Sequence, residues 1–221
     1  MIKGILFDFN GTMFFDGEKH KRAWNDFSVN YRNKPITDEE MAHMHGQTNK
    51  RIIEMLMPEA NLSDEKKEEL SLAKEALYRD ICRKEKESFH LVDGLEAFLD
   101  ACKEAGMPMT ICSASIKDNI DFFVEGFSLA TWFDPDKIVY DDGLHVDKIS
   151  MFEDGARRIQ VPIEECLVIE DSLSGIDFAK KAHVGRIIAI TTPDKVEEYK
   201  QFEGVSDVIT DFTKLSLNSL K

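Results

Sequence analysis

The sequence lacks the features that mark membrane-spanning, secreted and nucleic-acid-binding proteins. Its longest apolar runs are only a few residues, far short of the roughly 20 that a transmembrane helix needs. The N-terminus shows no signal-peptide pattern, and we expect a cytoplasmic protein. There are 28 Lys and Arg against 42 Asp and Glu, and the net charge of −14 argues against nucleic acid and anionic membranes as partners. A small anionic ligand stays compatible, because a few local cations can outweigh a distant negative surface.

Closely spaced cysteine pairs are also absent. The four cysteines, Cys82, Cys102, Cys112 and Cys166, lie far apart, and the last two lie in or beside apolar runs. We therefore expect free thiols in a reduced cytoplasm, rather than a disulfide framework or a zinc site. The chain has no internal repeat or low-complexity segment. Its 221 residues, 43% of them hydrophobic, fit one large domain or a core with a smaller insertion.

Short apolar runs that alternate with helical patterns predict the fold. The runs typical of buried parallel strands are Ile2 to Phe7, Met109 to Cys112, Leu167 to Ile169 and Ile187 to Ile190, with Ile138 to Tyr140 as a weaker fifth. Helical patterns cover Gly94 to Glu104, Lys117 to Val124, Lys148 to Ile159 and Ser174 to Lys181. This alternation predicts an α/β fold with a doubly wound parallel sheet.

The stretch between the first two strands breaks the alternation. It holds helical patterns at Glu18 to Tyr31, Asp38 to Met44, Thr48 to Met57 and Ser63 to Lys84, with no convincing strand. We predict an α-helical cap, residues 16–86, inserted into a catalytic core of residues 1–15 and 87–221. Such a cap would exclude water and help to select the substrate. The alternative is that these helices belong to the layer that covers the sheet.

Polar residues at the strand ends are the candidates for chemistry, because open α/β sheets bind ligands outside the carboxyl ends of their strands. The first strand ends in Asp8, the second in Ser113 and a third in Glu170 and Asp171, while Lys148 lies near a helix start. Carboxylates suit Mg²⁺, which would let the Asp8 carboxylate attack phosphorus. Ser113 and Lys148 would hold the transferring oxygens, with backbone N–H groups around residues 9 and 10 completing a phosphate cradle. The pattern predicts a phosphoryl-transfer site.

These residues resemble the motifs of the haloacid dehalogenase (HAD) superfamily, and within it the β-phosphoglucomutase-like enzymes with a helical cap. The first motif, D-x-D-G-T/V, matches residues 8–12; the second matches Ser113; the fourth, an acidic pair, matches Glu170-Asp171. The third usually reads Lys-Pro. Here it lacks the Pro, and we assign its lysine to Lys148, about two residues late, with Lys137 the nearest competitor. The resemblance implies a Mg²⁺ ion at Asp8, Glu170, Asp171 and the main-chain carbonyl of Asn10.

The resemblance also implies residues that contact the substrate or its phosphate. In the core these are Phe9, Gly11, Thr12, Ala114, Ser115 and Lys117. In the cap, residues 20–24 resemble the first cap helix and residues 46–48 the loop that enters the site, which makes His20, Gly46, Gln47, Thr48 and Asn49 candidates.

Two cap positions leave their roles open. A functional role and a solvated helix position are both open for His20, whereas we expect Trp24 to pack between helices. Asn49 stands where the mutases have an Arg that binds a distal phosphate, although Lys50 and Arg51 follow it.

Asn10 is the most informative departure from the family. Phosphatases and mutases have an Asp at this position, which protonates the leaving oxygen and later activates the attacking hydroxyl. An amide has no proton to exchange near neutral pH, so this step should be slower by roughly 10² to 10⁴. Four explanations stay open: a slow phosphatase using good leaving groups, His20 or water; an introduced substitution; kinship with dehalogenases, whose halide leaves unprotonated; and deamidation at Asn10-Gly11.

The combined pattern predicts a Mg²⁺-dependent phosphatase of small phosphorylated metabolites, expected to be sugar phosphates, acting through an aspartyl-phosphate on Asp8. The main alternative is a β-phosphoglucomutase. A dehalogenase would need no magnesium, which the acidic pair opposes, and a phosphonate hydrolase lacks a compelling Schiff-base lysine. A catalytically weak protein that binds a phosphorylated metabolite is the alternative from another class. We expect a monomer.

Overall fold

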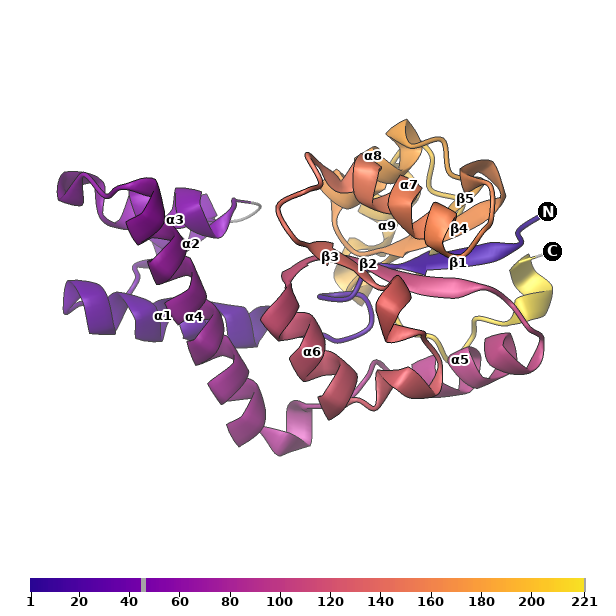
Figure 1. The fold of residues 1–221 in the computed structure, drawn as a ribbon, viewed down its shortest axis with the longest axis horizontal. Helices are drawn as coiled ribbons and strands as arrows, with labels where there is room; N and C mark the ends of the chain where they lie inside the picture. Colours follow the sequence, from indigo (N-terminus) through magenta and orange to yellow (C-terminus); the bar gives the residue numbers. More distant parts are fainter. Residues whose placement is uncertain (45–46, 221) are drawn as a thin grey trace. The chain divides into compact units, whose positions relative to one another are not determined.

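The computed structural model describes residues 1–44 and 47–220, which form two compact units. Unit 1 combines Met1–Phe15 with His90–Lys221, and unit 2 is Asp16–Phe89 (Figure 1). None of the helices in the described part of the chain is both long enough and apolar enough to cross a bilayer. All four cysteines are buried and free.

Unit 1 is built on a parallel sheet. Its described strands are β1 (Gly4–Phe7), β2 (Met109–Ile116), β3 (Val139–Asp141), β4 (Cys166–Glu170), β5 (Arg186–Ile190) and β6 (Asp207–Ile209). They lie in the order β3-β2-β1-β4-β5-β6, and every neighbouring pair is parallel. The central strands are buried, and this is why they appear in the sequence as continuous apolar runs.

Helices cover both faces of this sheet, so the predicted doubly wound fold is confirmed. These helices are α5 (Leu95–Glu104), α6 (Lys117–Gly126), α7 (Lys148–Arg158), α8 (Leu173–Lys181) and α9 (Val196–Lys200). In Figure 1, α7 and α8 lie on one side of the strands and α5 and α6 on the other. On the first side, Leu6 and Val168 join an apolar cluster with Phe152 and Ile176. On the other side, the Phe7 ring packs edge-on against Phe98 of α5.

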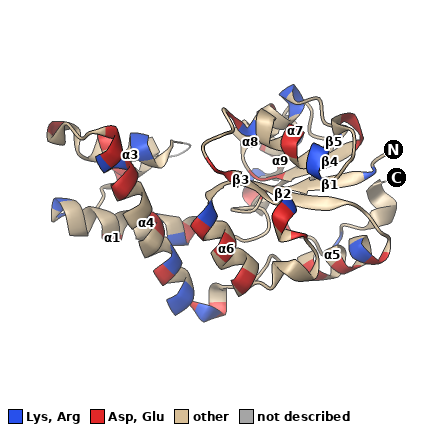
Figure 2. Cartoon of the chain, in the orientation of Figure 1, with Lys and Arg blue, Asp and Glu red and all other residues tan. Residues whose placement is uncertain are grey.

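The regular secondary structure described in unit 2 is helical, with short non-helical turns between the helices. It contains α1 (Gly17–Arg32), α2 (Asp38–Met44), α3 (Asn49–Leu56) and α4 (Asp64–Lys84). Trp24 and Phe27 of α1 pack with Ile53 of α3 and Leu70 of α4 in one apolar cluster, as expected for Trp24. Acidic and basic residues alternate along the helices, α4 among them (Figure 2).

Two strand predictions need correction. β2 continues to Ile116, beyond the predicted end at Cys112, because Ile116 still pairs with Asp141 of β3 after a shift in register. β6 was not predicted, since this edge strand has three residues and none of them is fully buried. The weaker candidate over Ile138 to Tyr140 does contain an edge strand, β3. Short 3-10 helices fill the remaining turns, at Pro58–Ala60, Lys86–Ser88, Leu129–Thr131, Pro135–Lys137, Ile163–Glu165, Pro193–Lys195 and Leu217–Leu220.

Candidate active site

The carboxyl ends of β1, β2 and β4 meet at one edge of the sheet and bring the predicted core residues together. The Asp8 amide donates to the Ile169 carbonyl at 3.0 Å, which ties the end of β1 to β4. The chain then turns sharply at Gly11, whose φ of +76° lies in the left-handed region. A Cβ at Gly11 would also lie 2.2 Å from Asp171 Oδ2, so glycine is required there on both counts.

Lys148 reaches into this edge from the first residue of α7. Its ammonium lies 2.7 Å from Asp8 Oδ1 and 2.6 Å from Glu170 Oε2. The helix begins there because the Asp147 carboxylate accepts a hydrogen bond from the Ser150 amide at 3.0 Å, which caps the N-terminus. A cap of α7 therefore sets the position of this lysine without the family's Pro. The competing Lys137 is exposed and pairs loosely with Asp134.

The loop before α7 is held by His145. Its Nδ1 lies 3.2 Å from Asp142 Oδ1, and its Nε2 lies 3.2 Å from Asp154 Oδ2 within α7. The ring thus links Asp142 of the loop to Asp154 of the helix that carries Lys148. No sequence signal singled out this histidine.

Three carboxylates form the centre of the site. Oxygen atoms of Asp8, Glu170 and Asp171 all lie within 4.8 Å of one another. Glu170 is fully buried and Asp8 is 5% exposed. Burial and then the neighbouring Glu170 raise the pKa of Asp8 to about 7, despite the opposing effect of Lys148. Although burial disfavours an ammonium, Asp8 and Glu170 raise the pKa of Lys148 above its ordinary value.

This cluster fits a divalent cation. One ammonium offsets only one of the three carboxylates, so excess negative charge remains in a buried site. Burial, and after it the neighbouring Glu170 charge, raises the pKa of Asp8, and a bound cation would offset that charge. Oxygen ligands of this number and hardness are those that Mg²⁺ prefers.

Further residues hold the carboxylates in place. The Ser172 amide and hydroxyl donate to Glu170 Oε1 at 3.0 and 2.8 Å. A Cβ at Gly175 would lie 2.2 to 2.4 Å from the Glu170 carboxyl atoms, so α8 can approach Glu170 only through a glycine. Tyr199 of α9 donates its hydroxyl to the Asp171 carbonyl at 2.7 Å. The capping pattern at Asp171-Ser172 was visible in the sequence, but nothing there indicated a role for Tyr199.

Asn10 faces the hydroxyl groups at the end of β2. Its side-chain oxygen accepts from Ser115 Oγ at 2.7 Å and from Ser113 Oγ at 3.4 Å. Thr12 Oγ1 donates to Asp171 Oδ1 at 3.4 Å. The Phe9 ring is buried and stacks on Phe123 at 4.3 Å, which leaves its main chain as the part that could serve the site.

In the described part of the chain, two residues of unit 1 that were predicted to contact the substrate have no side-chain hydrogen bond or ion pair with the carboxylates, Asn10 or Lys148 at this sheet edge. Lys117 is exposed on α6 and pairs with Asp121 of the same helix at 2.6 Å. Ala114 is exposed on β2.

The predicted residues of unit 2 take part in contacts within that unit. His20 stacks on Tyr78 at 4.1 Å, with its Nδ1 2.7 Å from the Lys74 ammonium and its Nε2 3.3 Å from Asp16. An ammonium is only a donor, so Nδ1 accepts and the ring proton lies on Nε2, toward Asp16. His20 is therefore a partly exposed helix residue that contacts Tyr78, Lys74 and Asp16.

The region around α3 is equally engaged. The Asn49 side-chain amide donates to Ser71 at 3.0 Å and to Glu75 at 2.7 Å. Thr48 caps α3 by accepting from the Arg51 amide at 3.3 Å, and Gln47 is exposed. Gly46 lies outside the described residues.

The buried pair Lys74 and Glu75 underlies this network. Burial lowers the pKa of Lys74 even though Glu75 lies 2.8 Å away. Burial alone would raise the pKa of Glu75, but Lys74 holds it at about 2. The pair is thus ionised and dependent on both partners.

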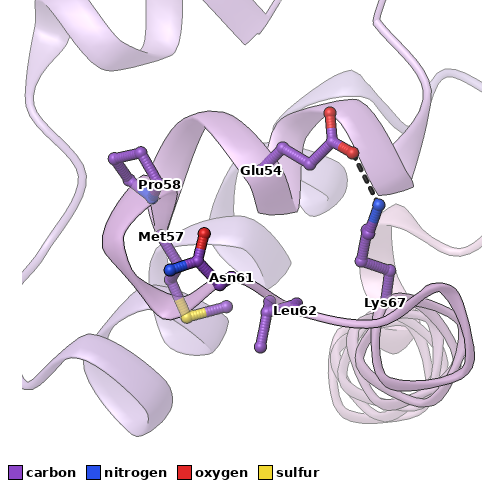
Figure 3. Close-up of a pocket in the computed structure, with 6 residues that line it drawn as sticks. All are labelled: Glu54, Met57, Pro58, Asn61, Leu62 and Lys67. Atoms are coloured by element: carbon purple, nitrogen blue, oxygen red, sulfur yellow. Dashed lines mark hydrogen bonds and ion pairs between the residues drawn. The ribbon is translucent and has the colours of Figure 1, made fainter.

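A separate hollow of about 200 Å³ lies within unit 2 (Figure 3). Its lining residues are Glu54, Met57, Pro58, Asn61, Leu62 and Lys67. The two charged ones neutralise each other, since Lys67 Nζ lies 2.7 Å from Glu54 Oε1. None of these lining residues belongs to the group of carboxylates found among the described residues, which lies at the sheet edge of unit 1.

Known proteins share both the sequence pattern and the fold. The family model for haloacid dehalogenase-like hydrolases matches residues 2–183. A HAD hydrolase of family IA, variant 3, from Entamoeba histolytica is 31% identical, with a TM-score of 0.92 over 99% of this chain and 97% of that one.

Two further structures share the fold at lower identity. A mutant of CbbY from Rhodobacter sphaeroides in complex with xylulose-(1,5)bisphosphate is 21% identical, with a TM-score of 0.82 over the whole of both chains. A β-phosphoglucomutase from Clostridium difficile is 19% identical, with a TM-score of 0.75 over 100% of this chain and 96% of that one. Two longer proteins from Arabidopsis thaliana are also similar, both at 26% identity. A haloacid dehalogenase-like hydrolase domain-containing protein matches over 58% of this chain and 40% of its own length. The chloroplastic protein SUPPRESSOR OF QUENCHING 1 matches over 99% of this chain and 20% of its own length.

Proposed function

The chain belongs to the haloacid dehalogenase-like hydrolases, and we propose that it is a Mg²⁺-dependent phosphatase of small phosphorylated metabolites. The observation that carries this proposal is the position of the Lys148 ammonium, which bridges Asp8 and Glu170 beside Asp171. A nucleophile, a cation for the phosphoryl oxygens and a metal-binding set are thereby gathered at one sheet edge. Sugar phosphates, which the resemblance implies, are the first substrates to test.

Asp8 is the proposed nucleophile. Its carboxylate would attack phosphorus to form an aspartyl-phosphate, which water would then hydrolyse. Lys148 would hold a phosphoryl oxygen and steady the attacking carboxylate, while Ser113 would donate to another oxygen. Burial of Asp8 excludes bulk water, which strengthens these interactions.

Mg²⁺ would be held by Asp8, Glu170 and Asp171, with the Asn10 carbonyl implied by the resemblance as a further ligand. When bound, the ion would reduce the repulsion between the carboxylates and the phosphate dianion. Ser172 and Gly175 would keep the Glu170 carboxylate in place.

The mutase alternative loses support in unit 2. Asn49, where the mutases have an Arg, donates inward to Ser71 and Glu75. The cations that follow it have acidic partners: Lys50 lies 2.7 Å from Glu68 and Arg51 lies 3.1 Å from Glu54. A second phosphate would have to compete with these contacts.

A panel of variants tests the proposal. Phosphate release from sugar phosphates should require Mg²⁺, should vanish in Asp8→Ala, and should rise in Asn10→Asp by roughly 10² or more. Turnover that persists in Asp8→Ala would contradict a covalent mechanism through Asp8. Tight binding without turnover in every variant, Asn10→Asp included, would favour a phosphometabolite-binding protein instead.

A further inference from the structure

We infer that this site acts on phosphorylated compounds whose leaving group departs without a proton, such as acyl and enol phosphates, and that it accumulates phosphorylated Asp8. This inference rests on the proposed nucleophilic role of Asp8. The grounds are which side chains at the sheet edge could donate or accept a proton, and which contacts each of them makes.

The described ends of β1, β2 and β4 contain few groups able to give up a proton. The three carboxylates there, Asp8, Glu170 and Asp171, are the nucleophile and the metal-binding set. Lys148 is committed to two of them, at 2.7 and 2.6 Å. None of these groups is left to protonate a departing oxygen.

The remaining polar side chains at these strand ends are an amide and hydroxyls. Asn10 accepts from Ser115 at 2.7 Å and from Ser113 at 3.4 Å. A carboxamide does not exchange a proton with a leaving group near neutral pH, and a serine hydroxyl is far too weak an acid. Asn10 thus lies beside the nucleophile as a hydrogen-bonding group, not as an acid or a base.

Three titratable side chains outside these strand ends have contacts of their own. Both ring nitrogens of His145 contact carboxylates, Asp142 and Asp154. The Tyr199 hydroxyl donates its proton to the Asp171 carbonyl. Within unit 2, His20 Nδ1 lies 2.7 Å from the Lys74 ammonium and Nε2 lies 3.3 Å from Asp16.

The first chemical step then depends on the leaving group alone. An Asp8 oxygen forms a bond to phosphorus, the bond from phosphorus to the leaving oxygen breaks, and that oxygen keeps the electron pair. An acyl phosphate releases a carboxylate and an enol phosphate an enolate, and both are stable enough to leave unprotonated. A sugar phosphate would have to release an alkoxide. A general acid ordinarily accelerates that step by roughly 10² to 10⁴.

The second step is slow for the same reason. Water must attack the phosphorus of the aspartyl-phosphate, the bond to Asp8 must break with its electrons returning to the carboxylate, and the proton of water must pass to solvent or phosphate. No side chain among those named above is available to take that proton. Phosphorylated Asp8 therefore builds up whenever the first step is fast, and the expected kinetic sign is a burst of about one equivalent.

The test compares acetyl phosphate with glucose 6-phosphate on the 221-residue chain with Mg²⁺. Asn10→Asp is the matched variant, because a carboxylate there can accept the same two serine hydrogen bonds. The readouts are kcat/KM for each substrate and the fraction of chains that carry one phosphoryl group by intact mass, with Asp8→Asn as the labelling control.

We expect the unaltered chain to be labelled by acetyl phosphate, with Asn10→Asp shortening the lifetime of the label. We also expect Asn10→Asp to raise kcat/KM for both substrates unequally. The fold-increase for glucose 6-phosphate should exceed the fold-increase for acetyl phosphate by a factor of at least about 10². Equal gains for both substrates, or no label from acetyl phosphate, would overturn the inference. If one of these outcomes is found but hydrolysis of glucose 6-phosphate still requires Asp8, the inference fails and the proposed function stands. Loss of Asp8-dependent hydrolysis and of labelling together would remove both.

Discussion

Replacing Lys148 by Met separates the electrostatic role of this lysine from its packing. Methionine keeps a flexible apolar stem of similar length but removes the ammonium that lies 2.7 Å from Asp8 and 2.6 Å from Glu170. If Lys148 holds a phosphoryl oxygen as proposed, kcat/KM should fall by about 10² to 10³, the usual loss for one preorganised donor.

The stability cost should be much smaller than for an ordinary buried ion pair. Removing one partner of such a pair costs about 3–5 kcal/mol when the other stays charged. Asp8 can instead take up a proton, since burial and Glu170 raise its pKa to about 7 even with Lys148 present. At pH 7 this protonation costs less than about 1 kcal/mol.

The sign of the pH dependence follows from the same shift. The folded-state pKa of Asp8 lies above its ordinary value, so the folded chain binds more protons than the unfolded chain between these two pKa values. Stability therefore falls as pH rises through that window, by up to about 1.4 kcal/mol per unit of pH. Loss of Lys148 raises this pKa further, which extends the window above pH 7.

Urea denaturation in metal-free buffer at about pH 6.5 and about pH 8.5 measures this effect, alongside kcat/KM with Mg²⁺. Lys148→Met should be near the stability of the unaltered chain at the lower pH and clearly weaker at the higher one. Lys137→Met is the matched control, because Lys137 is exposed and 3.8 Å from its partner. Retention of more than about a tenth of the activity in Lys148→Met would refute the assigned role. Equal destabilisation at both pH values would refute Asp8 as the proton acceptor.

Three further predictions follow from individual contacts. Gly175→Ala should weaken Mg²⁺ binding by about 10-fold in calorimetry, because its Cβ would meet the Glu170 carboxylate within 2.4 Å; unchanged affinity would contradict that contact. Glu75→Gln should lower the free energy of unfolding in urea by about 3 kcal/mol, because the buried Lys74 ammonium loses its carboxylate partner. Replacing Lys74 by Met and Glu75 by Leu together should recover most of that loss, and an unchanged stability of Glu75→Gln would contradict the burial of the pair. Peptide mass spectrometry should find no deamidation of Asn10 in the native protein, since the next amide nitrogen already donates at 2.8 Å within a turn, and a mass gain that tracks activity would show the opposite.

The sequence alone was sufficient for the fold class and for the order of the chemical groups. Buried strands of a doubly wound sheet must be apolar on both faces, and this leaves short apolar runs that can be recognised without a structure. β6 was not predicted from the sequence, because its three exposed or partly exposed residues at the sheet edge form no apolar run. The function of unit 2 as a cap and the monomeric state stay predictions.

The side-chain partners were decided by the tertiary structure. Lys148 and Lys137 could not be ranked firmly by spacing, and only the capped start of α7 brings Lys148 to Asp8 and Glu170. Tyr199 and His145 support the site from segments whose sequence gives no sign of it, because their contacts join residues through the packing of separate elements.

Local sequence thus determined that a carboxylate, the proposed nucleophile, directly follows β1 and that an amide lies two residues later. Strand ends carry this information because parallel strands all point their carboxyl ends to one edge. The environment of that nucleophile depended on residues up to 163 positions away, from Asp8 to Asp171. Burial, the neighbouring Glu170 carboxylate and the Lys148 ammonium set the charge of Asp8, and such a charge balance exists only once the chain has folded.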